Sequence, residues 1–373
     1  MFARSLAPAD LPRMFAAWRS LHAGDPAWVT PPQLWLAQGL RAALTQPDRF
    51  RLFGVERRGR LVATASVQRD GRFDDDGIAW LGHVEAADGD AAAVALAAAT
   101  DAARAWQARH LRGPRGLSRF EFVGVTVEGF DRRPPMLQGH HPRAASGWLE
   151  AAGMTPHHDH LAYETELVTA DGSPRPLPDR LAEQAARCTL PGLRFQRARR
   201  RRLDRDLIAA HGVLNESYAT VPDVHPMPRA QFLGLCRALL LSGHPELIQV
   251  GWLGDRAVAF AVCLPEINEA FAATDGRLWP TGLARVLRAW PRIETAAFKL
   301  IGVVPDLRGT GLHARLIAEV VRGAQRGGFR RIDGSIIDER NGPMRGVVEG
   351  IGMRVYRRYR VYDRALGEAP TGS

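Results

Sequence analysis

Apolar residues recur along this chain with two spacings, which predict helices and strands in a regular order. Residues 1–112 begin with a short strand, and later apolar runs and alternating stretches predict three more. A spacing of three to four residues predicts helices, the last of them rich in alanine. The helices are expected at Asp10–Leu21, Gln33–Leu44 and Ala91–His110, and the strands at Arg51–Val55, Arg60–Gln68 and Ile78–Glu85.

A second patterned region follows a segment rich in proline. Ala170–Asp179 contains three prolines and a glycine, a composition typical of linkers. We therefore predict a domain over 1–169, a linker over 170–190 and a second domain over 191–373. The second domain is expected to hold helices at Asp204–Tyr218 and Arg229–Leu241, strands at Leu247–Leu253, Ala257–Leu264, Arg330–Ile337 and Met353–Leu366, and an insert at Pro265–Arg292.

One stretch of this second domain has the outline of an anion-binding site. An apolar run that begins near Glu294 predicts a buried strand, and Pro305 and a glycine-containing turn then lead into a helix. The peptide N–H groups from Arg308 to His313 are free at the helix start, and Gly309 and Gly311 carry no Cβ that would keep a ligand away. The backbone is therefore expected to hold a phosphate.

The spacing of residues within this turn distinguishes between several known classes of nucleotide-binding loop. The glycines also fit the dinucleotide pattern G-x-G-x-x-A, but that pattern needs its first glycine directly after the strand, and residues 305–308 intervene. A P-loop is excluded because Lys299, the sole lysine, precedes the turn. The string Val303–Gly311 instead resembles the acyl-CoA loop of the GNAT acyltransferase superfamily, V-x-P-x-x-R-G-x-G. The resemblance implies acyl-CoA or acetyl-CoA as co-substrate, held by Val303, Val304, Arg308, Gly309, Thr310, Gly311, Leu312 and His313.

Two longer sets of residues resemble a narrower family, the bacterial tandem-GNAT proteins that include bacterial ceramide synthases. The sets are GP-x3-S-x5-G-x4-GFD-x2-PP, from Gly113 to Pro135, and S-x3-E-x-N-x2-M, from Ser335 to Met344. The resemblance implies an α/β (α+β) fold of two tandem GNAT-like lobes, each with a mixed, mostly antiparallel sheet flanked by helices. It also implies an N-acyltransferase with a small-molecule or lipid amine acceptor, such as a sphingoid amine. A small-molecule N-acetyltransferase and a non-catalytic CoA-binding module remain open alternatives.

The first lobe departs from this pattern at its own strand-to-helix turn. Glu85, Asp88 and Asp90 lie where a pyrophosphate would bind, and their carboxylates repel phosphate. We therefore expect CoA in the second lobe alone.

The acid and base of the reaction are less clear from the sequence. Many GNAT enzymes carry a tyrosine where this chain has Val348, so Tyr356, Tyr359 or Tyr362 on the last strand is considered as the proton donor. Glu339 and Asn341 follow the strand beside the expected cleft, although Asn341 also suits the N-cap of the next helix. Glu266 and Glu269, at the start of the insert, are alternative bases. Glu339, Asn341, Glu266 and Tyr356 are the catalytic candidates.

Composition and charge narrow the class of protein. The 373 residues favour two domains, and a net charge of +10 carried by arginine implies anionic partners. The arginine run Arg197–Arg205 has no interleaved aromatic residues, so we expect no nucleic acid but leave a peripheral contact with an anionic inner membrane open. No apolar segment approaches the roughly 20 residues that cross a bilayer, and we expect a cytoplasmic protein. The oligomeric state stays unassigned.

Cysteine and histidine spacing predicts no metal site. The three cysteines are far apart, which fits reduced thiols. The histidines of the loop region match no known zinc pattern, and a polar surface turn is the favoured interpretation. They are His140, His141, His157, His158 and His160.

Overall fold

The structure is a computed structural model of residues 1–373. It describes all of them except 32, 70–76, 198–202, 220–226, 231, 234–243, 245–246, 273, 275–280 and 368–373. Most of the predicted arginine run, most of the helix predicted at Arg229–Leu241, and Trp279 of the predicted insert lie outside the described residues.

The first lobe contains the helices and strands in the predicted order. Its helices are α1 (Leu11–Leu21), α2 (Gln33–Leu44), α3 (Gly89–Ala105) and α4 (Ala145–Ala151). Its strands are β1 (Phe2–Ser5), β2 (Phe50–Arg57), β3 (Arg60–Arg69), β4 (Ile78–Ala86), β5 (His110–Gly113), β6 (Val125–Glu128) and β7 (Thr155–Glu166). The alanine-rich face of α3 packs on β3, because small side chains let the helix approach the sheet closely.

The second lobe repeats the arrangement with one addition between β10 and β11. The described helices are α5 (Asp179–Ala186), α6 (Leu203–Tyr218), α8 (Ile267–Phe271), α9 (Gly282–Ala289), α10 (Leu312–Arg326) and α11 (Gly342–Gly350). The strands are β8 (Leu193–Arg197), β9 (Ile248–Leu253), β10 (Arg256–Pro265), β11 (Thr295–Val303), β12 (Arg331–Asp333), β13 (Ile337–Asp338) and β14 (Arg354–Ala365). The added segment carries α8 and α9 and corresponds to the predicted insert.

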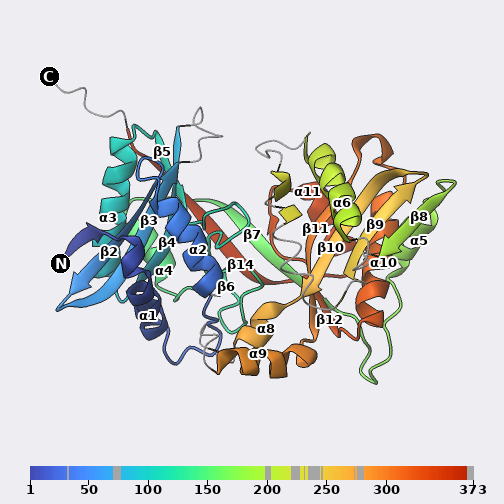
Figure 1. The fold of residues 1–373 in the computed structure, drawn as a ribbon, viewed down its shortest axis with the longest axis horizontal. Coiled ribbons are helices and arrows are strands. Elements are labelled where there is room, and N and C mark those ends of the chain that lie inside the picture. The colour runs from blue at the N-terminus through green and yellow to red at the C-terminus, as the bar shows by residue number, and fades with distance from the viewer. Residues whose placement is uncertain are drawn as a thin grey trace.

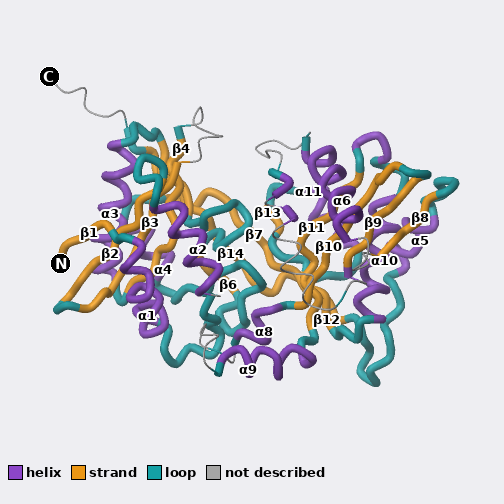
Figure 2. The backbone as a smooth tube through the Cα atoms, in the orientation of Figure 1, coloured by secondary structure: helices purple, strands orange, loops and turns teal. Residues whose placement is uncertain are grey.

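The two lobes exchange their last strands. The sheet order is β1-β2-β3-β4-β5-β14-β7-β12-β11-β10-β9-β8, so β7 of the first lobe pairs with β12 and β14 of the second lobe pairs with β5. Figure 1 shows β14, in red, running from the second lobe back into the lobe that holds the N-terminus. Figure 2 shows the resulting continuous path of strands, with helices around both halves. The described sheet is antiparallel except at β4–β5 and β11–β12.

Helix α5 lies inside the segment predicted as a linker. It packs on α10, and its buried Leu181 and Ala185 join the core of the second lobe. The division at 169/170 and 190/191 stays a prediction. The strand exchange means that each lobe is completed by chain from the other side of that division.

Candidate active site

Strand β11 separates from its parallel neighbour halfway along its length. The parallel pairing runs from Thr295 opposite Arg331 to Ala297 opposite Asp333, whereas β11 continues beside β10 to Val303. Just beyond, the Val304 N–H donates to the Val258 oxygen at 3.0 Å. Because such bonds alternate along an antiparallel ladder, Val303 directs its N–H to the other side, where β12 has left. The two strands therefore diverge beyond Ala297, and the Val303 amide points to the side that β12 has left while the Val304 amide is engaged. We call the region between the diverging strands the slot.

Helix α10 begins after a loop over residues 304–311, and no side chain of the described residues caps its start. Gly311 is the N-cap, at φ +80°, and the Arg315 N–H is the donor that reaches back to its carbonyl. The N–H groups of residues 312–314 lie ahead of that bond and carry the positive end of the helix dipole. This end of α10 is suited to an anion.

The two glycines of the loop serve different purposes. Gly309 also has φ +80°, and no atom lies within 4 Å of the place where a Cβ would be. At Gly311 a Cβ would lie 2.7 Å from the Gln184 oxygen at the end of α5. Gly309 therefore leaves the loop open to a ligand, whereas Gly311 lets α5 pack against α10.

Charged and polar side chains of the loop are already oriented. Arg308 donates from Nη2 to the Ser217 oxygen at 2.5 Å, which ties the loop to the end of α6. The Thr310 hydroxyl donates to the Leu307 oxygen at 2.7 Å. Burial, and then the charge of Arg308, lower the pKa of His313, so its ring is neutral at neutral pH. Arg308 thus adds a fixed positive charge beside the helix start.

Glu266 lies at the end of β10, between the two lobes. Its Oε1 accepts from the Asn268 N–H at 3.1 Å, and its Oε2 accepts from the Met136 N–H of the first lobe at 2.8 Å. The side chain is 6% exposed, and burial raises its pKa to about 7. A carboxyl with this pKa exchanges protons readily near neutral pH.

A second polar group lies where β11 and β12 separate. The Tyr356 hydroxyl on β14 donates to Asp333 Oδ2 at 2.6 Å, and burial together with Asp333 raises the tyrosine pKa. Lys299 Nζ lies 3.9 Å from Asp333 Oδ1 and donates to the backbone oxygens of Met136 and Ser335. The charges of Lys299 and Asp333 both influence the pKa of Glu266. The structure thus brings Glu266 and Tyr356 together around two residues that the sequence reasoning did not select.

Two curated relatives match almost the whole chain. The bacterial ceramide synthase of Caulobacter vibrioides is 30% identical over an alignment of 382 residues that covers 96% of each chain. The chain belongs to the bacterial ceramide synthase family. Protein YghO of Escherichia coli K12 is 26% identical over 376 residues, which cover 96% of this chain and 93% of YghO. No protein-family model matches the chain.

Solved structures confirm the predicted fold. A tandem GNAT protein from the clavulanic acid biosynthesis pathway aligns over 98% of both chains with a TM-score of 0.56 and 13% identity. A GCN5-related N-acetyltransferase from Sphaerobacter thermophilus aligns over 98% of this chain and 95% of its own, with a TM-score of 0.52 and 14% identity. These structures show a fold of two tandem GNAT lobes, and membership of the ceramide synthase family makes the chain an N-acyltransferase.

Glu339 and Asn341, the other two catalytic candidates, form hydrogen bonds with residues other than Glu266. Glu339 accepts from the Asp159 N–H at 2.8 Å and so connects the segment after β13 to β7. Asn341 is exposed and accepts from the Met344 N–H at 3.2 Å, which makes it the N-cap of α11. The catalytic assignment of these two residues stays a prediction.

The sequence contained a signal for Lys299 and Asp333, the two residues that the sequence analysis did not select. Lys299 is the sole lysine of the chain and interrupts an apolar run, and a charged residue in a buried strand needs a partner. Asp333 lies within the next predicted strand, Arg330–Ile337. Only the 3.9 Å contact between Lys299 Nζ and Asp333 Oδ1, across β11 and β12, shows that they belong to one site.

The prediction that the histidines form a polar surface turn is wrong. His157, His158 and His160 lie on β7, and His140 and His141 are buried in the first lobe. Alternation along β7 turns His158 and His160 to the same face, and Tyr359 of β14 lies opposite His160 in the same sheet. The spacing of the histidines along the sequence could not show that three of them lie on one β-strand.

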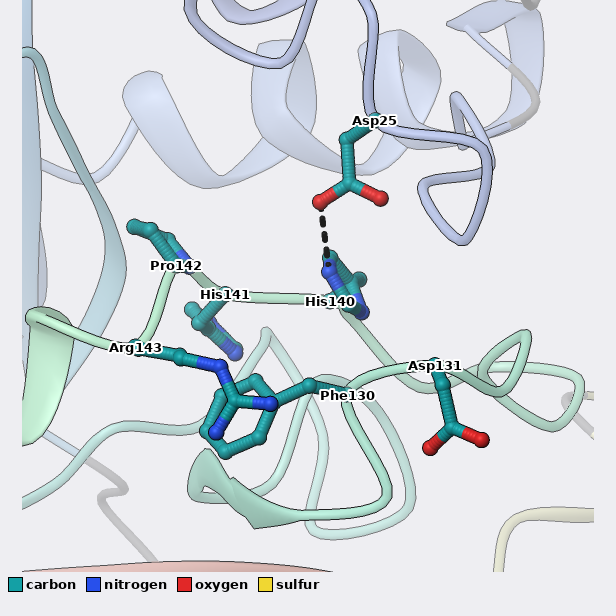
Figure 3. Close-up of a pocket in the computed structure, with 7 residues that line it drawn as sticks. All are labelled: Asp25, Phe130, Asp131, His140, His141, Pro142 and Arg143. Carbon is teal, nitrogen blue, oxygen red and sulfur yellow. Dashed lines mark hydrogen bonds and ion pairs between the residues drawn. The ribbon is translucent and has the colours of Figure 1, made fainter.

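A pocket of about 260 Å³ lies in the first lobe and shares no residue with the slot along β11. His140 donates from Nε2 to Asp25 at 2.8 Å and accepts on Nδ1 from Arg357 at 2.5 Å. Burial and then Arg357 lower the pKa of His140 to about 4, so the ring is neutral. Figure 3 shows the Asp25–His140 bond at one side of the pocket and Arg143 beside the Phe130 ring. These two hydrogen bonds satisfy both ring nitrogens of His140.

None of the helices in the described ranges combines the length and apolar character that crossing a bilayer requires.

Proposed function

We propose that this enzyme transfers an acyl group from an acyl-CoA thioester to an amine in the slot between β11 and β12. One observation carries the proposal: β11 separates from β12 and leads, through the loop over residues 304–311, into the uncapped start of α10. The pyrophosphate of CoA would be held by the N–H groups of residues 309–314 and by Arg308. The pantetheine arm would lie along β11, where the Val303 N–H can donate to the thioester carbonyl.

The polar groups beside the slot suit the proton transfers of this reaction. The amine nitrogen attacks the carbonyl carbon, the C–S bond breaks, and one proton must move from nitrogen to the leaving thiolate. Glu266, with a pKa of about 7, is the proposed acceptor of the amine proton. Tyr356 keeps its proton because burial and Asp333 raise its pKa, so it can serve as the donor to the thiolate.

The proposed acceptor is an amine on a lipid, such as a sphingoid amine. The relative of 30% identity is named a ceramide synthase, and ceramides are amides of sphingoid amines. Helix α9, in the segment between β10 and β11, leaves Leu283 and Leu287 exposed by 48% and 64%. Arginines lie among these leucines at 285 and 288, a mixture that suits contact with an anionic bilayer surface.

Turnover with matched donors and acceptors tests the proposal. Purified full-length protein would receive acetyl-CoA or a long-chain acyl-CoA, each with a sphingoid base or a small polar amine, while free thiol is measured. The long-chain donor with the sphingoid base should turn over fastest. Faster turnover of acetyl-CoA with polar amines would instead indicate a small-molecule acetyltransferase, and CoA binding without turnover would indicate a binding module.

A further inference from the structure

Two histidines and an aspartate meet on one face of the exchanged strand β7. His158 and His160 alternate along β7, and Asp338 on β13 pairs with His160. The Nε2 atoms of the two histidines are 3.2 Å apart, and His158 Nε2 lies 3.8 Å from Asp338 Oδ2. All three potential ligand atoms lie within 4.8 Å of one another. The three side chains therefore bring two nitrogen atoms and one carboxylate oxygen, all potential metal ligands, close together.

Each of the three side chains can offer a lone pair to one ion. A hydrogen bond joins the two Nε2 atoms, so one of them carries a proton in the metal-free protein. Metal binding needs both rings protonated on Nδ1, so this proton would move from Nε2 to Nδ1 of the same ring. Asp338 Oδ2 also accepts from Arg340 Nη2 at 2.6 Å, and its second lone pair would serve the ion.

The distances also fit a first-row divalent ion. A tetrahedral ion with bonds of about 2.0–2.1 Å to nitrogen separates two ligand nitrogens by roughly 3.3–3.4 Å. The observed 3.2 Å needs almost no adjustment, whereas Asp338 must move closer, because its Oδ2 lies 3.8 Å from His158 Nε2 and the three ligand atoms lie within 4.8 Å of one another.

Outer contacts hold two of the three side chains in place. His157 Nδ1 lies 2.7 Å from His158 Nδ1, so a proton on the latter leaves Nε2 of His158 with a free lone pair. Arg340 donates from Nε to Asp338 Oδ1 at 2.9 Å. Such outer partners orient ligands and are a regular part of metal sites.

We propose that His158, His160 and Asp338 bind one divalent transition-metal ion of the zinc class. Three protein ligands leave a coordination position for water. The ion would fasten β13 to β7 beside the junction of the lobes, and so fix the segment that leads into α11. This site is independent of the proposed CoA slot, and its test uses no acyl substrate.

The experiment measures metal binding by the full-length protein after chelator treatment. Calorimetry with Zn²⁺ would give stoichiometry and affinity, and the visible absorption of bound Co²⁺ would report nitrogen and oxygen ligands. The variants are His160→Gln, Asp338→Asn and His157→Phe. The control is His110→Gln, because His110 also contacts a carboxylate, that of Asp363 at 2.8 Å, but is 40% exposed and lies on β5, which β14 separates from β7.

The wild-type chain and the control should each bind one ion and gain thermal stability from it. His160→Gln and Asp338→Asn should lose more affinity than the roughly 10- to 100-fold expected for His157→Phe, which removes only an outer partner. Asp338→Asn serves as the decisive variant if His160→Gln does not fold, because Asn keeps an oxygen for Arg340. The proposal is overturned if the wild type binds none of these ions, or if both ligand variants retain wild-type stoichiometry and affinity.

Discussion

The two lobes share a strand arrangement but differ at the position where a ligand would enter. Strands β4 and β5 are parallel, as β11 and β12 are. After β5 the chain stays against β4: the Arg115 N–H donates to the Leu81 oxygen at 2.9 Å. A Cβ at Gly82 would lie 2.1 Å from the Arg115 oxygen. The first lobe thus fills with its own backbone the space that the second lobe leaves along β11.

The starts of α3 and α10 also differ, because a side chain caps α3 whereas the N-cap of α10 is a glycine. Asp88 caps α3 by accepting from the Ala91 N–H at 2.9 Å, and both its oxygens accept from Arg57. The hydrogen bonds from Arg57 lower the pKa of Asp88 to about 2. Helix α10 has Gly311 at the same position, with no side chain to satisfy its amides. The two helix starts therefore differ in the side chain at the N-cap, in addition to the backbone that lies against β4 in the first lobe.

The largest expected effect comes from the carboxyl beside the open slot. Glu266→Gln removes the proposed base and should lower kcat by about 100- to 10,000-fold while CoA affinity is kept. The wild-type rate should rise with pH through about 7, because the carboxylate form accepts the proton, and the variant should lose this rise. Steady-state kinetics of both proteins, measured from about pH 5 to about pH 9, would show whether the variant has lost this rise.

The control for this comparison is a carboxyl of the first lobe. Burial also raises the pKa of Glu121, which accepts from the Ser118 hydroxyl at 3.0 Å. Glu121→Gln should leave kcat within about twofold, in the range of substitutions away from a site. Equal losses in both variants would mean that burial alone, and not the slot, determines the effect of Glu266.

An acidic side chain in the open loop should make the second lobe resemble the first. Gly309→Asp places a carboxylate beside the proposed pyrophosphate position, in a left-handed conformation that Asp and Asn tolerate better than most residues. CoA should bind on the order of 100-fold more weakly, since unit charges about 5 Å apart repel by about 3 kcal/mol at an effective dielectric of about 20. Gly309→Asn has the same shape without the charge and should lose much less affinity in calorimetry.

The smallest effect is expected at the closed helix start. Asp88→Ala removes the cap of α3 and should lower the free energy of unfolding by about 1 kcal/mol, measured by denaturant titration. Asp88→Asn keeps a capping oxygen and should retain most of that stability. CoA should bind with one equivalent per chain in both variants. A second equivalent in Asp88→Ala would show that the cap, and not the backbone filling at Gly82, closes the first lobe.

Much of the fold, and the backbone conformation of the loop that precedes α10, could be predicted from the sequence. The motif from Val303 to Gly311 describes a local backbone path, and the free amides at a helix start follow from helix geometry wherever the helix lies. The acidic turn at Asp88 was likewise visible, because a cap acts on residues a few positions away. The structure confirms the tandem GNAT fold and the predicted order of the described strands and helices.

Only the tertiary structure determined which distant side chains meet. Glu266, Lys299, Asp333 and Tyr356 come from the ends or interiors of separate segments and face one another because β14 and β7 are exchanged between the lobes. The same exchange places Asp338 beside His160, a pairing that local spacing had argued against. A sequence pattern specifies which face of a strand is buried, but neighbours in a sheet depend on strand order and register. Those are set by the packing of the whole chain, and this is why the loop could be predicted and the side chains around it could not.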